Sequence, residues 1–308
     1  MSETSALMDT LRQEGVSPDL LRAVEEYRTA HPLAEALRPR IPSPAFVYYG
    51  REVWEQALAA LLCGENLLLA GGKATGKNVL AENLSAAFGR PAWDISFHVN
   101  MDAASLIGMD TFEGGAVKFR PGPVYRCAQC GGFGVLDEIN MAKNEALAVL
   151  HAVLDFRRAI DVPGYDKILL HPAARMIGTM NYGYAGTREL NEALVSRFLV
   201  IDMPPLTEET LFYLMQSKFP DLKPAAREAL AGLYLDLQKK AKQAEITTRA
   251  LDLRGLFGAI GTMRQGLSPY LAVQIGIVNK CFDLFEKEIV RDVVRTRIPE
   301  EWTPQDVF

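Results

Sequence analysis

Gly71-Gly-Lys-Ala-Thr-Gly-Lys-Asn78 is the stretch from which the fold of this chain can be read. It fits the pattern G-x-x-x-x-G-K, with Lys77 as the lysine. An apolar run, Asn66–Ala70, precedes it and a helical pattern, Val79–Phe88, follows it. The sequence therefore predicts a buried strand, a glycine-rich loop and a helix, an order in which backbone N–H groups and the helix N-terminus can surround a phosphate.

We expect the whole loop to contact a nucleotide. Lys77 would reach the β- and γ-phosphates as a positive charge. Asn78 stands where a Ser or Thr usually supplies a hydroxyl to Mg²⁺. Its amide oxygen can also bind a hard cation, so retained metal binding and weakened hydrolysis are both compatible with it. The residues expected at the nucleotide are Gly71, Gly72, Lys73, Ala74, Thr75, Gly76, Lys77, Asn78 and Val79.

Two further apolar runs end in polar side chains. Phe133–Glu138 predicts a strand that ends in Asp137, expected to hold Mg²⁺, and Glu138, expected to orient and activate a water molecule. Arg175–Asn181 predicts a buried strand ending in Asn181, whose amide can hold that water or contact the γ-phosphate. Ligands gather at the carboxyl ends of parallel strands, so we expect these groups to lie near the loop.

The bulk composition excludes several classes. The chain has 308 residues, 49% of them apolar and 23% charged, which is ordinary for a soluble protein of two domains. A net charge of −5 gives no support to a nucleic-acid-binding surface. No apolar run approaches the ~20 residues that span a bilayer. The first thirty residues lack an apolar signal core, so we expect a cytoplasmic protein with no membrane contact.

Three parts follow from the pattern along the chain. Residues 1–45 predict an N-terminal helical extension, with helices over 5–13 and 19–30. Residues 46–205 alternate strands and helices, which predicts an α/β nucleotide-binding domain with a parallel sheet covered on both faces. Residues 206–308 predict a smaller, all-helical domain. The remaining expected strands are 92–96 and 198–202, and the expected C-terminal helices are 207–218, 224–243, 248–264, 269–280 and 281–294.

Cys127 and Cys130 form a C-x-x-C pair on an expected helix. No second cysteine pair and no histidine pair completes a zinc set. We therefore interpret both as reduced thiols, partly buried.

The order of these motifs resembles that of the MoxR-type branch of the AAA+ ATPases. The match runs from about residue 46 to 205 and is carried by Tyr49–Glu52, Ser105–Gly108, Val117–Pro123, Asp137–Asn140 and Gly186–Phe198. The resemblance implies an α/β P-loop AAA+ core with a helical lid, bound ATP and Mg²⁺, and an adenine pocket lined by the backbone of Tyr49 and Gly50.

The same resemblance implies further roles for polar residues. Asn181 matches the sensor-1 position. Arg197 matches the arginine finger that reaches the γ-phosphate of a neighbouring subunit, with Arg188 the lesser candidate. Arg249 resembles the sensor-2 arginine at the start of a lid helix, with Arg254 the runner-up. The alternative is that neither arginine has a catalytic role: Arg197 would then only place a positive charge at a helix C-terminus, and Arg249 would only be exposed to solvent.

Some positions depart from the family pattern. Gly72-Lys73 stands where a proline is often found, and Met141 replaces the arginine that usually follows Asp-Glu-Ile-Asn. Lys143 partly supplies that charge. The segment 157–170 predicts a β-hairpin with its turn at Pro163-Gly164, which resembles the hairpin before sensor 1 that faces a pore or a partner in related machines.

The leading hypothesis is a chaperone-like ATPase that remodels or activates a protein client. An arginine finger acting in trans implies a homo-oligomeric ring, expected to be a hexamer. The resemblance also implies a partner with a von Willebrand factor A domain. A nucleotide-gated binding switch with little turnover is the alternative, based on Asn78 and Met141. A nucleic-acid motor is a third reading, against which the net charge counts.

Overall fold

The computed structural model describes residues 3–162, 164–182 and 189–308. The described chain divides into two compact units. The first comprises residues up to 72 together with 76–203, and the second comprises 204–308, with which residues 73–75 are grouped.

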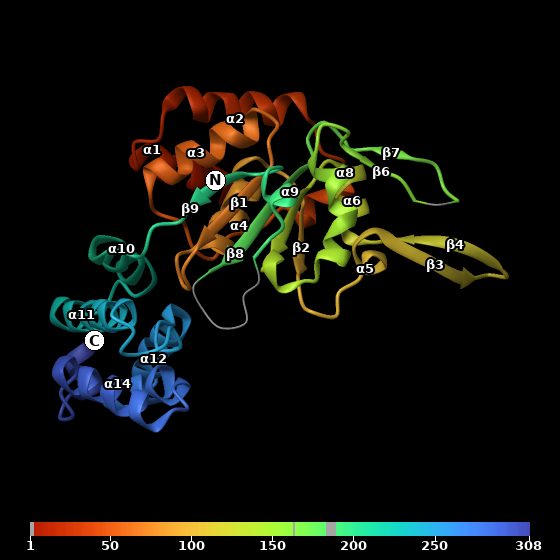
Figure 1. The fold of residues 1–308 in the computed structure, drawn as a ribbon. Helices are drawn as coiled ribbons and strands as arrows, with labels where there is room; N and C mark the ends of the chain where they lie inside the picture. Colours follow the sequence, from red (N-terminus) through yellow and green to blue (C-terminus); the bar gives the residue numbers. More distant parts are fainter. Residues whose placement is uncertain (1–2, 163, 183–188) are drawn as a thin grey trace. The chain divides into compact units, whose positions relative to one another are not determined.

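A five-stranded parallel sheet forms the centre of the first unit (Figure 1). Its strand order is β2-β5-β8-β1-β9, so the strand that leads into the glycine-rich loop lies next to β8. Every pairing in this sheet is parallel. The strands are β1 Leu67–Gly71, β2 Ala92–Ser96, β5 Phe133–Asp137, β8 Arg175–Asn181 and β9 Leu199–Asp202. All five strands predicted from the sequence are present, with ends shifted by a residue or two.

Helices surround this sheet. Those of the first unit are α1 Glu3–Gln13, α2 Pro18–Ala30, α3 Arg51–Leu62, α4 Lys77–Ala87, α5 Ala103–Ile107, α6 Pro123–Cys130, α7 Asn144–Leu147, α8 His151–Leu154 and α9 Glu192–Val195, with 3-10 turns at Glu35–Arg40, Ile139–Met141 and Ala148–Leu150. The parallel sheet, its surrounding helices and a helical C-terminal region confirm the predicted fold class.

Alternating strand residues feed two separate apolar cores. Leu67 and Leu69 of β1 point into one core with α1, α2, α3 and α4, whereas Leu68 points into the other with α5 and α6. Successive side chains of a strand face opposite sides of a sheet, so a fully apolar strand is buried on both faces. Burying each such leucine stabilises the fold by about 1.5–3 kcal/mol relative to its exposure. The sheet is thus a rigid base for the groups at its carboxyl edge.

The N-terminal helices are part of the first unit. Leu11 of α1 and Val24 of α2 are fully buried in the same core as α3 and α4. The hydroxyl of Tyr27 donates to the carbonyl of Ala173 over 2.8 Å. Residues 1–45, expected as an extension, are therefore packed into the core of the sheet domain over their described helices.

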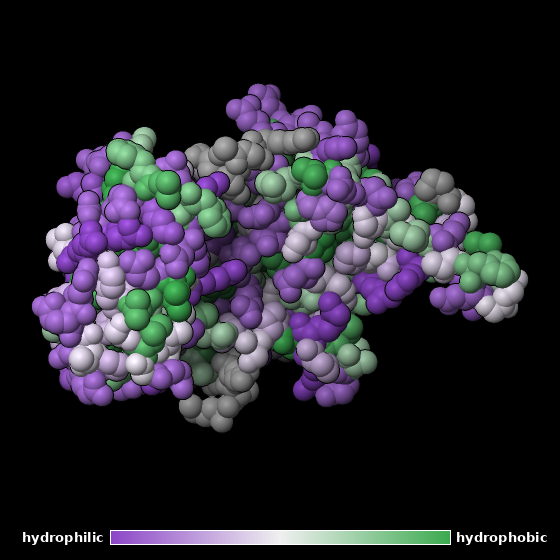
Figure 2. All heavy atoms as spheres, turned by 90° about the horizontal axis from the view of Figure 1, so that it is seen from below, coloured by the Kyte–Doolittle hydropathy of each residue, from purple (hydrophilic) through white to green (hydrophobic). Residues whose placement is uncertain are grey.

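Two antiparallel hairpins project from the sheet domain. β3 (Gly108–Glu113) pairs with β4 (Ala116–Pro121), and β6 (Ala159–Ile160) pairs with β7 (Ile168–Leu169), which confirms the hairpin expected over 157–170. Pro163 of its expected turn lies outside the described residues. The first hairpin presents Phe112 and Val117, 75% and 63% exposed, and Figure 2 shows hydrophobic side chains at its far end.

The second unit is helical, as expected. Its helices are α10 Glu208–Lys218, α11 Pro224–Lys242, α12 Leu253–Arg264, α13 Pro269–Gly276, α14 Leu284–Arg297 and α15 Pro304–Val307, with a 3-10 turn at Val278–Lys280. No helix in the described part of the chain is long and apolar enough to cross a membrane.

Two helix starts in this unit differ from the prediction. α12 begins at Leu253 rather than at 248, because the Asp252 side chain caps it by accepting from the Gly255 N–H over 3.1 Å. α14 begins at Leu284 rather than at 281, because Asp283 caps it in the same way. The hydrophobic periodicity of the sequence predicted both helices to begin several residues before these acidic caps.

Candidate nucleotide-binding site

The glycine-rich loop joins β1 to α4 through a left-handed turn. Gly76 has φ +85° and immediately precedes the first residue of α4, Lys77, without any side-chain cap. A Cβ atom on Gly76 would lie 3.0 Å from the ring of Tyr48, so both the dihedral angle and the space favour glycine. The uncapped N-terminus of α4 leaves backbone N–H groups for an anion, which is the property that the motif predicted.

Lys77 is buried beneath this loop. Its Nζ donates to the carbonyl oxygens of Gly71 at 3.1 Å and Gly72 at 2.6 Å. Burial lowers the pKa of Lys77 to about 8, and the negative charges of Asp137 and Glu138 oppose part of that shift. The ammonium group is therefore held in place beside the loop, where a bound phosphate would add negative charge next to it.

Asn78 lies against Asp137. Its Nδ2 donates to Oδ1 of Asp137 over 2.9 Å, and the same oxygen accepts the hydroxyl of Thr179 over 2.7 Å. A carboxylate can only accept, so the amide nitrogen must face it and the amide oxygen of Asn78 is directed elsewhere. The loop and the acidic strand are thus joined by a direct side-chain bond.

Glu138 has an uncommon backbone conformation. Its φ is +53°, in the left-handed region that residues with a side chain rarely adopt. Its N–H donates to Oγ1 of Thr179 over 3.0 Å, and Nδ2 of Asn181 donates to its Oε1 over 3.0 Å. Asn140 in turn donates to the backbone carbonyl of Asn181 over 2.8 Å. Strained residues of this kind gather at functional sites.

The structure therefore brings together Lys77, Asn78, Asp137, Glu138 and Asn181 at one edge of the sheet. β1, β5 and β8 lie side by side, and their carboxyl ends meet there. Gly71 is paired with Asn181 in the β1–β8 register. This juxtaposition is what the spacing of the motifs predicted.

The site offers few protein ligands for Mg²⁺, and that small number fits the way this ion is usually bound beside a nucleotide. The described residues contain no group of three His, Cys, Asp or Glu side chains able to enclose a metal. Asn78 and Thr179 both donate to Oδ1 of Asp137, so Oδ2 is the oxygen of Asp137 that these two donors leave for a cation, while the amide oxygen of Asn78 is turned away from Asp137. Magnesium in nucleotide sites takes only one or two protein ligands and completes its shell with phosphate and water, so this sparse set is adequate.

The segment before α3 contains a residue that sequence reasoning missed. Tyr48 is buried, which raises its pKa to about 12, and its ring packs against Gly50 and Gly76. Asn83 of α4 accepts from the Tyr48 N–H over 2.9 Å and donates to the carbonyl of Phe46 over 2.8 Å. The expected Tyr49 and Gly50 follow directly. Asn83 is fully buried in α4, and no pattern in the sequence marks either Asn83 or Tyr48.

Arg197 is placed apart from this cluster. Its Nη2 lies 3.7 Å from Oδ2 of Asp155, and another of its nitrogens donates to the carbonyl of Ala193. Its Nε is buried and has no hydrogen-bond partner among the described residues. Arg197 therefore takes no part in the hydrogen-bond network around Asp137. Arg188, the lesser candidate, lies outside the described residues.

Arg249 and Arg254 both belong to the second unit. Arg249 precedes α12 rather than standing on it, and its guanidinium lies 5.9 Å from the ring centre of Phe282. Arg254 is on the first turn of α12 and is exposed. Only the runner-up therefore has the helix-start position that the resemblance assigns to the sensor-2 arginine.

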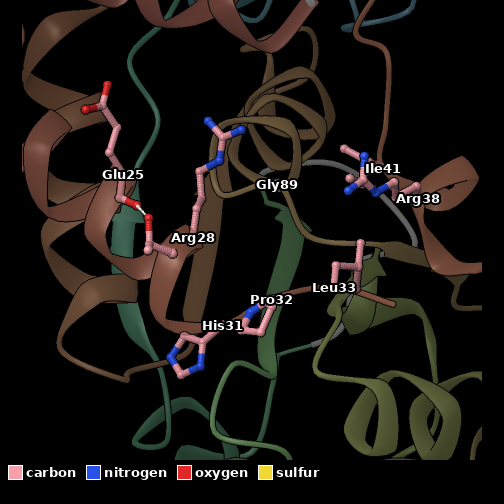
Figure 3. Close-up of a pocket in the computed structure, with 9 residues that line it drawn as sticks. Glu25, Arg28, His31, Pro32, Leu33, Arg38, Ile41 and Gly89 are labelled. Carbon is pink, nitrogen blue, oxygen red and sulfur yellow. Dashed lines mark hydrogen bonds between the residues drawn. The ribbon is translucent and has the colours of Figure 1, made fainter. Parts of the chain in front are cut away.

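Other features lie elsewhere. Cys127 is buried, Cys130 is partly buried and both are free, as interpreted. A surface pocket of about 670 Å³ is lined by residues of α2, the segment after it and Gly89 (Figure 3). Figure 3 shows Arg28 and Arg38 among its lining side chains. None of the nucleotide-site residues lines this pocket.

A phosphate loop beside a strand that ends in two acids defines a P-loop nucleotide-binding protein. Residues 66–198 match the family model of the AAA domain of the dynein-related subfamily. Over 301 residues the chain is 31% identical to the uncharacterized protein YojN of Bacillus subtilis, covering 96% of this chain and 97% of that protein. It is 30% identical over 255 residues to the uncharacterized protein SH1500 of Staphylococcus haemolyticus, covering 81% of this chain and 97% of that protein.

A solved structure assigned as an ATPase from Cytophaga hutchinsonii is 17% identical, with a TM-score of 0.45 and coverage of 90% of this chain and 89% of that chain. The chain belongs to the same family as the Bacillus and Staphylococcus proteins and carries an AAA domain of the dynein-related subfamily.

Proposed function

We propose that this protein binds ATP at the Lys77 loop and hydrolyses it. The observation that carries this is the continuous hydrogen-bond network from Asn78 through Asp137 and Thr179 to Glu138 and Asn181. This network places the phosphate-binding loop next to the two acids, the juxtaposition that would let a base act on water beside a bound phosphate.

Each residue has a role in this reaction. The backbone of the loop and Lys77 bind the phosphates, and Lys77 stabilises the charge that spreads over them in the transition state. Glu138 orients the attacking water and accepts its proton, while Asn181 positions Glu138 and the water. Asp137, beside Asn78, would hold Mg²⁺, and the ion would supply positive charge that offsets the charge of the phosphates. The adenine of the nucleotide is proposed to lie against Tyr48, Tyr49 and Gly50.

Assembly completes the proposed site. We assign Arg197 as the finger that reaches a neighbour's phosphates in a homo-oligomeric ring, which the family resemblance gives as a hexamer. Its buried Nε without a partner and its loose, 3.7 Å pairing with Asp155 support an arginine that can exchange partners. Arg249, with Arg254 as the second candidate, is proposed to contact the nucleotide from the lid.

The consequence of hydrolysis is proposed to be remodelling of a client protein in the cytoplasm, as in MoxR-type AAA+ ATPases. The exposed apolar side chains of the β3–β4 hairpin support contact with a protein partner. A partner carrying a von Willebrand factor A domain is part of this proposal. The proposed parts are residues 1–45, whose described helices pack into the core of the sheet domain, residues 46–205, the nucleotide-binding domain, and residues 206–308, the lid.

The experiment that tests this function is steady-state ATP hydrolysis against protein concentration, with light scattering in parallel. A rate per subunit that rises as the protein assembles supports the finger in trans. Arg197→Ala should lose turnover and keep nucleotide affinity. Mixing it with Lys77→Ala should restore some activity, because each variant contributes one intact half of a shared site. No recovery at any ratio rejects the shared site.

A nucleotide-gated switch is the second candidate. It is favoured by Asn78, whose amide nitrogen is bound to Asp137 where a hydroxyl ligand to Mg²⁺ would usually stand. Tight ATP binding with near-zero turnover at every concentration, unchanged in Asn78→Thr, would select this candidate over the ATPase.

A further inference from the structure

The hydroxyl of Thr179 lies between the two acids of the site. It donates to Oδ1 of Asp137 over 2.7 Å and accepts from the N–H of Glu138 over 3.0 Å. Thr179 is 1% exposed and belongs to β8, not to the acidic strand itself. We propose that Thr179 is the positioning residue that sets the orientation of both acids. The role assigned to Thr179 rests on the proposed ATPase function.

The backbone alone cannot supply this position. The β5–β8 ladder ends at the pair Leu136↔Gly178, so Glu138 lies beyond the last paired residue. Its N–H would lack a strand partner there, and the Thr179 hydroxyl takes that place. A partly buried N–H without an acceptor is costly, so the hydroxyl fixes where the chain leaves the sheet. It thereby supports the left-handed φ of +53° at Glu138.

The direction of these bonds is fixed by chemistry. A hydroxyl has one proton, and a carboxylate can only accept, so the proton of Thr179 must point to Asp137. Its oxygen lone pairs are then available to the Glu138 N–H. The hydrogen bonds run in one direction, from the Glu138 N–H to Thr179 and from Thr179 to Asp137, so the side chain between them must both accept and donate, as a hydroxyl does.

The arrangement decides which oxygen of Asp137 serves the cation. Oδ1 already accepts from Thr179 and from Asn78, so Oδ2 is the oxygen left for Mg²⁺. Asn181, two residues along β8 and thus on the same face as Thr179, holds Oε1 of Glu138. One face of β8 therefore positions both carboxylates: Thr179 holds that of Asp137, and Asn181 holds that of Glu138.

The test compares Thr179→Val, which keeps the shape and removes the hydroxyl, with Thr179→Ser, which keeps the hydroxyl. Turnover of Thr179→Val should fall by about 10–100-fold, the range found when a group that orients a metal ligand is removed. The Mg²⁺ concentration that half-saturates nucleotide binding, measured by fluorescence with an ATP analogue, should rise. Nucleotide binding without Mg²⁺ should stay close to that of the wild type.

Thr179→Ser should restore both turnover and the Mg²⁺ midpoint towards wild type. Thr262→Val is the matched control, because that hydroxyl donates to the carbonyl of Ala259 over 2.8 Å in the helical unit and faces no acid. It should change neither readout. If Thr179→Val fails to fold, Thr179→Cys, with its weaker donor, takes its place and should shift both readouts in the same direction.

The role of Thr179 is overturned if the hydroxyl-free variant matches wild type in turnover and in Mg²⁺ midpoint. Wild-type protein that binds Mg²⁺-nucleotide without hydrolysing it would reject the proposed function alone, since the Mg²⁺ midpoints of the variants still decide the role of Thr179. Wild-type protein that binds no nucleotide would reject both.

Discussion

The side-chain amide of Asn181 donates to Oε1 of Glu138 over 3.0 Å. This bond joins the ends of β8 and β5, two adjacent strands of the sheet. One oxygen of the glutamate is therefore engaged before any phosphate arrives. In the proposed reaction this bond holds the Glu138 carboxylate in the orientation from which it accepts a proton from water.

We expect Glu138→Gln to keep ATP binding and to lose hydrolysis by at least about 100-fold, because the amide cannot accept the proton that a general base removes. The two shapes are nearly identical, so the loop and Lys77 should be undisturbed. Equilibrium binding and phosphate release measured on the same preparation check this. Turnover at the wild-type rate would exclude Glu138 as the base.

Asn181→Ala should reduce turnover by about tenfold or more while leaving nucleotide affinity largely unchanged, since it removes the group that orients Glu138. Asn191→Ala is a suitable control: that asparagine caps α9 by accepting from the Ala193 N–H and does not contact the acid pair. If both variants lose the same activity, the effect is structural and not specific to Glu138.

The pKa of Lys77 makes nucleotide binding depend on pH. With a folded-state pKa of about 8, below the ordinary 10.5, the native protein loses this proton at a pH where the unfolded chain still holds it. This group therefore makes stability rise with pH between about 8 and 10.5. ATP affinity should do the opposite and fall above about pH 8, because the neutral amine no longer attracts phosphate.

Calorimetry in two buffers of different ionisation enthalpy checks this dependence. Binding near pH 8.5 should take up protons, because bound phosphate stabilises the charged amine. Lys77→Ala should show neither the affinity nor the proton uptake. Wild-type affinity that stays constant from pH 7 to 9.5 would contradict the assignment of a depressed pKa to Lys77.

Asn83→Ala should destabilise the first unit by roughly 1–3 kcal/mol, because it leaves the Tyr48 N–H and the Phe46 carbonyl without their partner. Urea unfolding of the intact protein measures this loss. Gln56→Ala, at an exposed position of α3, is the control and should have a small effect. ATP affinity should fall in Asn83→Ala only, since the segment beside the loop would lose its anchor.

The strands and the acid positions could be predicted because they depend on local patterns. A run such as Leu67–Gly71 is apolar on both faces only when it is a central strand, and parallel strands bring Asp137 and Asn181 to one edge. Thr179 and Asn83 could not be assigned, because their partners lie 42 and 35 residues away. The pairing of Arg197 with Asp155 could not be predicted from the sequence either, nor could the Asp252 cap at which α12 begins.

Helix α4 begins at the phosphate loop with Lys77 and grips the segment 46–48 through Asn83, six residues later. At 1.5 Å per residue the two points are separated by about 9 Å along a stiff rod. Under the proposed function, the first turns of α4 set the distance between the phosphate-binding loop and the segment beside the base, and hence the length of nucleotide that fits. A change in the pitch or length of α4 would then alter which nucleotides fit, even though none of the altered residues touched the ligand.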